Sequence, residues 1–323
     1  MENNLLLSKF WMRIWALLID SLILGLFGFI LGLIFKNFFI SFGESAKLIG
    51  WIISLFYFTI LNSKLYKGGT LGKKVMKIQV TDIKGNFIDV KTSFIRSLVF
   101  TAPFFLNGFK IPGVSSFSFV TIIQGIIIFT IGLGIIVFYI FNKETRQSIH
   151  DIVAKTYVVQ DFRNKEIGFM PKIRKLPFYI TGAILLVTIG VSIYSLSSTS
   201  KISKLVPVYE DILKQENITN AAVNMNYIPI TDDAGNKRFV YTVTVYVNKD
   251  LEITQNNINE QAKNPELLET VKTFINSNAY DTDNDILNVV VVSGYDIGIA
   301  KQYKSFNFYK PISEWKRIFG KSL

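Results

Sequence analysis

The sequence predicts an α-helical polytopic membrane bundle of about five spans, with a small cytoplasmic β-hairpin and a C-terminal soluble α+β domain. Three observations predict this fold class. Half of the 323 residues are hydrophobic, and several apolar runs are long enough to cross a bilayer. Residues 1–199 contain 21 Lys and Arg against 9 Asp and Glu, whereas residues 200–323 contain 14 against 15. Within 200–323, apolar and polar residues alternate as they do in strands.

The charge distribution predicts three regions. Residues 1–175 would form the transmembrane domain with basic loops, 176–199 a final helix and linker, and 200–323 an extracytoplasmic domain. Basic loops favour the cytoplasmic side, which places the N-terminus inside the cell. Because the basic residues lie beside apolar spans and form no separate cluster, we expect no nucleic-acid partner. The absence of cysteine excludes disulfides, thiolate nucleophiles and zinc–thiolate sites.

The first predicted span, 14–35, contains a single charge, Asp20. Arg13 lies seven residues before it, so both side chains leave the same helix face, with Asp20 roughly 10 Å deeper. An unpaired carboxylate there costs at least ~2.5 kcal/mol, so we expect Asp20 to face the bundle interior with Arg13 as its partner. Either a buried structural pair or a ligand site fits this pattern. Gly28 and Gly32 predict close approach of a neighbour.

Four further apolar runs predict the remaining spans, at 48–65, 94–109, 118–141 and 176–196. The run 94–109 is short, begins near Arg96 and contains Pro103, so a re-entrant or interfacial segment is an alternative to a crossing. We favour a crossing, because an even number of spans must separate two loops on the same side.

The basic loop 64–96 predicts a β-hairpin. Residues 76–80 alternate, Lys84-Gly85-Asn86 forms a turn, and 87–90 returns as a second strand. Before it, 68–74 is reminiscent of a phosphate loop but lacks the required first glycine and final Ser or Thr. We interpret its residues as a tight turn whose lysines reach lipid phosphates; the residues concerned are Gly69, Thr70, Gly72 and Lys73.

The second basic loop, 142–175, contains Arg146, His150 and Asp151. If this segment is helical, Arg146 and His150 share a face. The His–Asp pair fits a proton relay, a metal fragment, or a capping and packing role. No Cys, second His or Glu stands at ligand spacing, and no nucleophile accompanies the pair. The alternating aspartates of 281–285 lack the glycine and glutamate of a calcium loop. We therefore expect no metal, no cofactor and no enzymatic activity.

The C-terminal region alternates between helix and strand patterns. Helices are predicted at 206–216, 264–276 and 312–319, and strands at 221–230, 238–247, 286–292 and 299–309. Asn264 and Pro265 mark a helix start, because Asn caps helices and Pro suits the first helical position. We expect a turn at 232–236 and a linker at 197–200.

Three stretches together resemble the bacterial RDD family of membrane proteins. They are Arg13-Ile-Trp-Ala-Leu-Leu-Ile-Asp20, Gly69-Thr70-Leu71-Gly72-Lys73-Lys74, and Arg146-Gln-Ser-Ile-His150-Asp151 with the following Ala154 to Val159. Arg96 stands where similar proteins carry an arginine. The resemblance covers about residues 8–160. It implies that Arg13, Asp20 and Asp151 are the family's arginine and two aspartates, and that the protein resides in a bacterial plasma membrane. Transport of an unidentified ligand has been proposed for the family, and some similar proteins are linked to sodium–proton antiport.

Two functional hypotheses follow. In the first, the bundle moves a small cation or solute in exchange for protons, with Asp20 titrating and His150 and Asp151 acting as gate or relay. Because a bundle of about five spans is small for a carrier, this hypothesis implies a homo-oligomer. In the second, the protein is a non-transporting anchor or sensor whose domain 200–323 binds an envelope protein. In both hypotheses the protein is embedded in the lipid bilayer, which is therefore a partner.

Overall fold

The computed structural model describes residues 7–111, 114, 118–160, 172–197, 204–231, 237–251 and 260–320. The chain divides into two compact units. We call the first the helical unit; it comprises Met1–Ile30, Lys47–Leu196 and Ile297–Ala300. We call the second the sheet unit; it comprises Leu31–Ala46, Ser197–Asp296 and Lys301–Leu323. Both units therefore take segments that are distant in the sequence.

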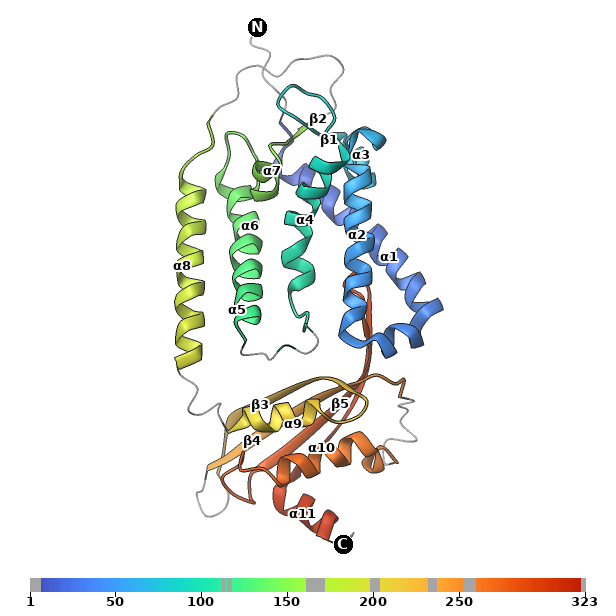
Figure 1. Ribbon diagram of the computed structural model, residues 1–323, viewed down its shortest axis with the longest axis vertical. Helices are drawn as coiled ribbons and strands as arrows, with labels where there is room; N and C mark the ends of the chain where they lie inside the picture. Colours follow the sequence, from blue (N-terminus) through green and yellow to red (C-terminus); the bar gives the residue numbers. More distant parts are fainter. Residues whose placement is uncertain are drawn as a thin grey trace. The chain divides into compact units, whose positions relative to one another are not determined.

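The long helices are rich in apolar residues and follow the predicted runs (Figure 1). They are α1 (Phe10–Phe42), α2 (Ala46–Leu61), α4 (Val90–Leu106), α5 (Phe119–Ile126), α6 (Gly132–Phe141) and α8 (Leu176–Ser197). A π-helical turn, Ile127–Ile131, joins α5 to α6. Within the described ranges, three stretches are long and apolar enough to span a membrane: Phe10–Leu61, Phe119–Phe141 and Leu176–Tyr194. The expected count of five spans is not confirmed.

The span predicted at 94–109 forms helix α4, which has 17 residues and buries the charged side chain of Arg96. It is not among the three candidate spans. The first candidate contains both α1 and α2, separated by the 3-10 turn Gly43–Ser45. The helical nature of all the predicted runs is thus confirmed, whereas their division into crossings remains a prediction.

Four short elements gather at one end of the helices (Figure 1). They are α3 (Leu71–Val75), β1 (Ile78–Thr81), α7 (Ile149–Val153) and β2 (Tyr157–Gln160). Strand β1 pairs antiparallel with β2, which places Val80 opposite Val158. These two valines are almost fully buried and pack with Ala16 of α1 in a small apolar core. The two-stranded sheet therefore joins the two basic loops to the first helix.

The predicted hairpin between 76–80 and 87–90 is wrong. The turn exists, because Asp82 accepts backbone N–H groups from Lys84 and Asn86, but only one bridge, Thr81 to Phe87, follows it. The carboxylate of Asp89 then accepts the N–H of Thr92 at 2.7 Å and caps α4. Helix capping competes with strand pairing here, and the buried valines of β2 supply the missing strand partner.

The predicted close approach at the glycines of α1 is confirmed, although the neighbour is not a helix. In the helical unit, a Cβ atom on Gly28 would lie 2.8 Å from Cγ1 of Ile299. A Cβ atom on Gly50 of α2 would lie 1.6 Å from the carbonyl oxygen of Ile297. In the sheet unit, a Cβ atom on Gly32 would lie 1.8 Å from the hydroxyl of Tyr295. Larger residues are incompatible with this packing.

The sheet unit contains four strands in the order β3-β4-β5-β6. Its elements are α9 (Leu205–Leu213), β3 (Ile218–Thr231), β4 (Lys237–Val247), α10 (Pro265–Ile275), β5 (Ile286–Asp296), β6 (Lys301–Pro311) and α11 (Ile312–Gly320). Strands β4 and β5 are parallel, and the other two pairings are antiparallel. The predicted α+β elements are thus confirmed, whereas the turn at 232–236 and most of the linker at 197–200 lie outside the described residues.

Alternation of valines builds the core of the sheet unit. Val243, Val245, Val289 and Val291 are fully buried beneath α10, which contributes Leu267, Val271 and Phe274 to the same cluster. As predicted, Asn264 caps α10 by accepting the N–H of Leu267 at 3.1 Å. Asp285, the last of the alternating aspartates, accepts the N–H groups of Phe239 and Thr282 at 3.1 Å each. It therefore serves as a loop cap.

Cysteine cross-linking will distinguish the observed β1–β2 pairing from the hairpin. Because the chain has no native cysteine, a Gln79→Cys/Val159→Cys variant places one thiol pair at directly opposed positions. We expect it to cross-link on mild oxidation, since opposed strand residues have Cβ atoms about 4.5–5.5 Å apart. The control, Gln79→Cys/Asp89→Cys, places cysteines where a continued hairpin would oppose them. Cross-linking of the control but not of the first pair would contradict the structure.

Candidate functional site

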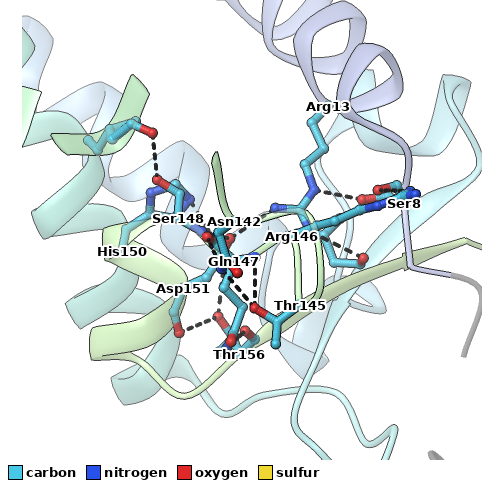
Figure 2. A network of polar contacts seen from close by, with 12 residues as sticks. Ser8, Arg13, Asn142, Thr145, Arg146, Gln147, Ser148, His150, Asp151 and Thr156 are labelled. Atoms are coloured by element: carbon cyan, nitrogen blue, oxygen red, sulfur yellow. Dashed lines mark hydrogen bonds and ion pairs between the residues drawn. The ribbon is translucent and has the colours of Figure 1, made fainter. Parts of the chain in front are cut away.

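Asp151 of α7 lies between two arginines from different helices, and Figure 2 shows its contacts with the surrounding loop. Arg13 Nη1 donates to Asp151 Oδ2 at 3.0 Å, while Arg96 Nε and Nη2 donate to Oδ1 at 3.0 and 2.7 Å. Both arginines are 5% exposed, and Asp151 is fully buried. Buried ions are tolerated only when their partners are close and hydrogen-bonded. We call these three residues the arginine–aspartate node.

The local sequence places Asp151 for this role. Ser148 precedes α7, and Asp151 at the third helical position accepts the Ser148 N–H at 3.2 Å, as in a capping box. Arg146 and His150 would share a face only if both were helical, and that condition is not met because α7 begins at Ile149. Arg146 has a left-handed backbone (φ 52°) and donates through Nη1 to the carbonyl oxygens of Leu7 and Ser8. It therefore anchors the chain before α1.

The charges of the node fix the ionisation of Asp151 and His150. Burial alone raises the pKa of Asp151, but the guanidinium groups of Arg96 and Arg13 outweigh it and hold that pKa well below its usual range. Burial lowers the pKa of His150 to about 3. His150 packs edge-on against Phe100, with ring centroids 5.0 Å apart, and its Nε2 lies 3.6 Å from Asp151. It is therefore neutral near pH 7.

Asp20 is buried as predicted, but its predicted partner is wrong. Its Oδ1 accepts the hydroxyl of Tyr57 at 2.6 Å and the N–H of Gly72 at 2.8 Å, and its Oδ2 accepts the hydroxyl of Thr70 at 2.6 Å. Arg13 instead joins Asp151. Arg13 and Asp20 are two helical turns apart, roughly 10 Å along the axis, so their side chains do not meet even though they lie on the same helix face. Asp20 is held by three neutral donors.

The glycine-containing loop 68–74 donates hydrogen bonds to a carboxylate of the same chain, that of Asp20. Thr70 caps α3 and accepts the N–H of Lys73 at 3.3 Å while its own hydroxyl donates to Asp20. Gly72 presses against α1, since a Cβ atom there would lie 2.0 Å from the carbonyl oxygen of Ala16. The predicted tight turn occurs at Gly68, which has φ +68°, whereas Gly69 has room for a Cβ atom.

Lys73 turns inward, contrary to the prediction that this lysine reaches lipid phosphates. Its Nζ donates to Asn62 Oδ1 at 2.8 Å. Burial, reinforced by the charge of Arg96, lowers its pKa from 10.5 to about 7. Between these two pH values the unfolded chain holds a proton that the folded chain has released, so stability rises with pH across that window. Lys73 is thus an ionisable side chain that titrates near neutral pH.

A cavity of about 40 Å³ lies where these groups converge. It is lined by five of the predicted residues, namely Arg13, Asp20, Lys73, Arg96 and His150. A buried water needs at least about 10–15 Å³, so the cavity admits two or three waters or one small ion. The hydroxyl oxygen of Ser97, which also lines it, is buried and has no hydrogen-bond partner within the described part of the chain. We call this space the polar cavity.

Several residues of the site were not predicted from the sequence. Tyr57 and Asn62 lie at the end of the second apolar run, where a tyrosine and an asparagine interrupt the pattern. Gln147 donates to the carbonyl oxygen of Thr156, and Asn142 donates to that of Gln147, at 2.9 and 2.8 Å (Figure 2). These contacts hold α7 beside β2. Within the described ranges, no group of three His, Cys, Asp or Glu side chains could hold a metal.

Comparison with known proteins agrees with the motifs. The model of the RDD family matches residues 7–155, which confirms the resemblance over the part of the chain that contains the arginine–aspartate node and all the residues that line the polar cavity except Val158. No family model identifies the C-terminal domain. No curated protein and no solved structure matches the chain.

Neutralising Asp151 will test the node. In Asp151→Asn, two buried guanidinium groups lose the counter-charge that they share, and we expect the free energy of unfolding to fall by about 3–5 kcal/mol. The control is Glu144→Gln, which removes an exposed carboxylate paired with Arg174 and should cost less than about 1 kcal/mol. Tryptophan fluorescence during chemical unfolding in detergent measures both. Equal losses would show that the node is not a special constraint.

Adding one methyl group will test the contact between the loop and α1. Gly72→Ala forces a Cβ atom into the backbone of Ala16, and we expect a loss of about 1–3 kcal/mol with a lower melting temperature. Gly69→Ala, three residues away, meets nothing closer than 3.4 Å and should melt like the parent protein. A Gly72→Ala protein that melts with the parent would mean that this loop does not pack on α1.

Proposed function

We propose that this RDD-type membrane protein exchanges protons for a small inorganic cation at the polar cavity. One observation carries the proposal: Asp20 and Lys73, a carboxylate and an amine with a pKa of about 7, line the same water-sized space. The cavity is too small for an organic solute, which narrows the cargo to an ion or a proton. An exchange site requires a group that changes charge at the working pH, and Lys73 has that property.

The charges around the cavity favour competition between a proton and a cation. With Lys73 neutral, the two arginines balance Asp20 and Asp151. With Lys73 protonated, the cavity gains one positive charge, and a second cation is repelled. A proton on Lys73 and a cation beside Asp20 therefore exclude each other. If the cavity opens to the two sides of the membrane in turn, this exclusion couples the transport of a proton in one direction to the transport of a cation in the other.

Oxygen atoms suited to a cation surround Asp20. An ionised carboxylate offers about four acceptor positions, and the three donors on Asp20 leave one available. The carbonyl oxygen of Asn62 and the unpartnered hydroxyl of Ser97 line the same cavity. Hard cations bind oxygen ligands of this kind. In this mechanism the titrating group is Lys73, and the carboxylate of Asp20 attracts the cation.

The location and assembly belong to the same proposal. The basic loops that bracket the polar cavity favour the cytoplasmic face of a bacterial plasma membrane, with the sheet unit on the other side. A homo-oligomer would supply the additional helices that a carrier of this size lacks. The node and the β1–β2 sheet then form a rigid inner end around the exchange site.

A second candidate function rests on the sheet unit, which has a hydrophobic core of its own. An anchor or sensor that binds an envelope protein would need such a domain, whereas a simple carrier does not. Strand β6 offers exposed basic and aromatic residues, including Lys301 and Tyr303. Loss of a captured envelope protein from full-length Tyr303→Asp, with unchanged ion flux, would favour this role.

Flux measurements in proteoliposomes will test the exchange. With an acidic interior and a pH-sensitive dye, addition of Na⁺, K⁺ or Li⁺ should drive proton exit in the parent protein. We expect Lys73→Met to lower the rate at least about tenfold and to remove its dependence on pH near 7, because the titrating amine is gone. Asp20→Asn should lower the rate as well, by weakening cation attraction.

The matched control for Lys73 is its neighbour Lys74, whose ammonium lies over the ring of Tyr66 at the surface. Lys74→Met should keep the rate within about twofold. Parent protein that moves protons no faster than empty liposomes for every cation would rule the proposal out. So would a Lys73→Met protein with unchanged flux and pH profile.

A further inference from the structure

A second cavity, of about 390 Å³, lies between the first turn of α1 and the last turn of α6. It shares two lining residues, Arg13 and Tyr139, with the polar cavity. Four of its lining residues are cations, namely Lys9, Arg13, Lys143 and Arg146, and none is an acid. We call it the basic pocket. The exchange of cations proposed above does not use it.

The positive charge of the basic pocket is largely uncompensated. Arg13 is paired with Asp151. Among the residues that the structure describes, Arg146 donates to the backbone carbonyl oxygens of Leu7 and Ser8 and has no acidic partner. Lys9 and Lys143 are exposed and make no ion pair with any residue that the structure describes. Glu144, adjacent in sequence, is held by Arg174 at 2.6 Å. A pocket that concentrates cations in this way selects an anionic ligand.

The pocket is built into the fold. Arg146 holds a left-handed backbone, which is uncommon for residues other than glycine, and its N–H donates to the carbonyl oxygen of Asn142 at 3.0 Å. Asn142 is 1% exposed and donates to Thr145 and to the carbonyl oxygen of Gln147 at 2.8 Å each (Figure 2). The backbone of Arg146 is therefore fixed by buried hydrogen bonds, and within the described part of the chain its side chain bonds through Nη1.

The opposite wall of the pocket is apolar. Phe10 and Ile140 line it and are 36% and 48% exposed, and both belong to stretches long and apolar enough to span a membrane. A ligand that fits must combine an anionic head with an apolar part that continues into the bilayer. Basic pockets between transmembrane helices bind lipid head groups in this way. A free phosphate ion would leave the apolar wall uncovered.

We propose that the basic pocket binds the head group of an anionic phospholipid. The phosphate lies against Lys143 and Arg146, Lys9 approaches from the chain preceding α1, and the glycerol and upper acyl chain follow Phe10 and Ile140. Guanidinium and ammonium donors match phosphate oxygens through charge-assisted hydrogen bonds. Because Arg13 borders both cavities, the bound lipid would secure the α1 end of the arginine–aspartate node.

Native mass spectrometry of the full-length protein in detergent will test the proposal. Phosphatidylglycerol and phosphatidylcholine with identical acyl chains serve as probes. We expect the parent protein to retain phosphatidylglycerol at least about tenfold more strongly, and Lys9→Gln/Lys143→Gln to lose about tenfold in that affinity. Both lysines are exposed, so the variant should fold, and Lys143→Arg should bind like the parent because it keeps the charge.

The control is Lys84→Gln/Lys91→Gln, which removes two exposed charges from the other basic loop. It should retain phosphatidylglycerol within about twofold of the parent. An equal loss in both double variants would mean that only the overall charge matters, and equal retention of the two lipids would also overturn the proposal. Displacement of phosphatidylglycerol by an equal concentration of inorganic phosphate would assign the pocket to a free anion instead.

Discussion

The ion pair network of Asp151 constrains the rest of the helical unit. A single carboxylate joins Arg13 near the start of the first helix to Arg96 at the start of another, across 138 and 55 residues of sequence. Because an isolated buried guanidinium is costly, neither helix can move away from α7 without leaving a charge unpaired. The β1–β2 sheet and the anchoring of Arg146 on Leu7 and Ser8 act in the same direction. One end of the bundle is thereby rigid.

This rigid end gives the polar cavity its chemistry. The node carries one net positive charge, which together with burial makes protonation of Lys73 unfavourable and brings its pKa to about 7. Asp20 faces the same space and accepts three hydrogen bonds, two of which come from Thr70 and Gly72 of the loop that contains Lys73. The loop that contains Lys73 therefore both places its amine at the polar cavity and donates hydrogen bonds to Asp20, the carboxylate beside it. The carboxylate of Asp20 and the titrating amine of Lys73 are the two groups that coupled exchange of a cation and a proton requires.

The sequence predicted the elements well and their partners less well. Arg13, Asp20, Arg96, His150 and Asp151 could be identified because ionisable residues beside apolar runs are rare. The first four line the cavity, and Asp151 is bound to two of them, Arg13 and Arg96. Helical spacing showed that Arg13 and Asp20 share a face, but no local pattern reveals a contact 138 residues away. The pairing of β1 with β2 was missed for the same reason, since a nearby turn suggested a closer partner. The inward turn of Lys73 depends on Asn62, which no periodicity indicated.

The most direct test of this account is the pKa of Lys73. Protein with ¹³C at the lysine Cε position can be titrated by NMR in detergent, and the Lys73 resonance assigned by its absence from Lys73→Arg. We predict a midpoint near pH 7 for Lys73, well below the value of about 10.4 that is usual for a lysine. A Lys73 resonance that stays at the protonated shift up to pH 9 would contradict it.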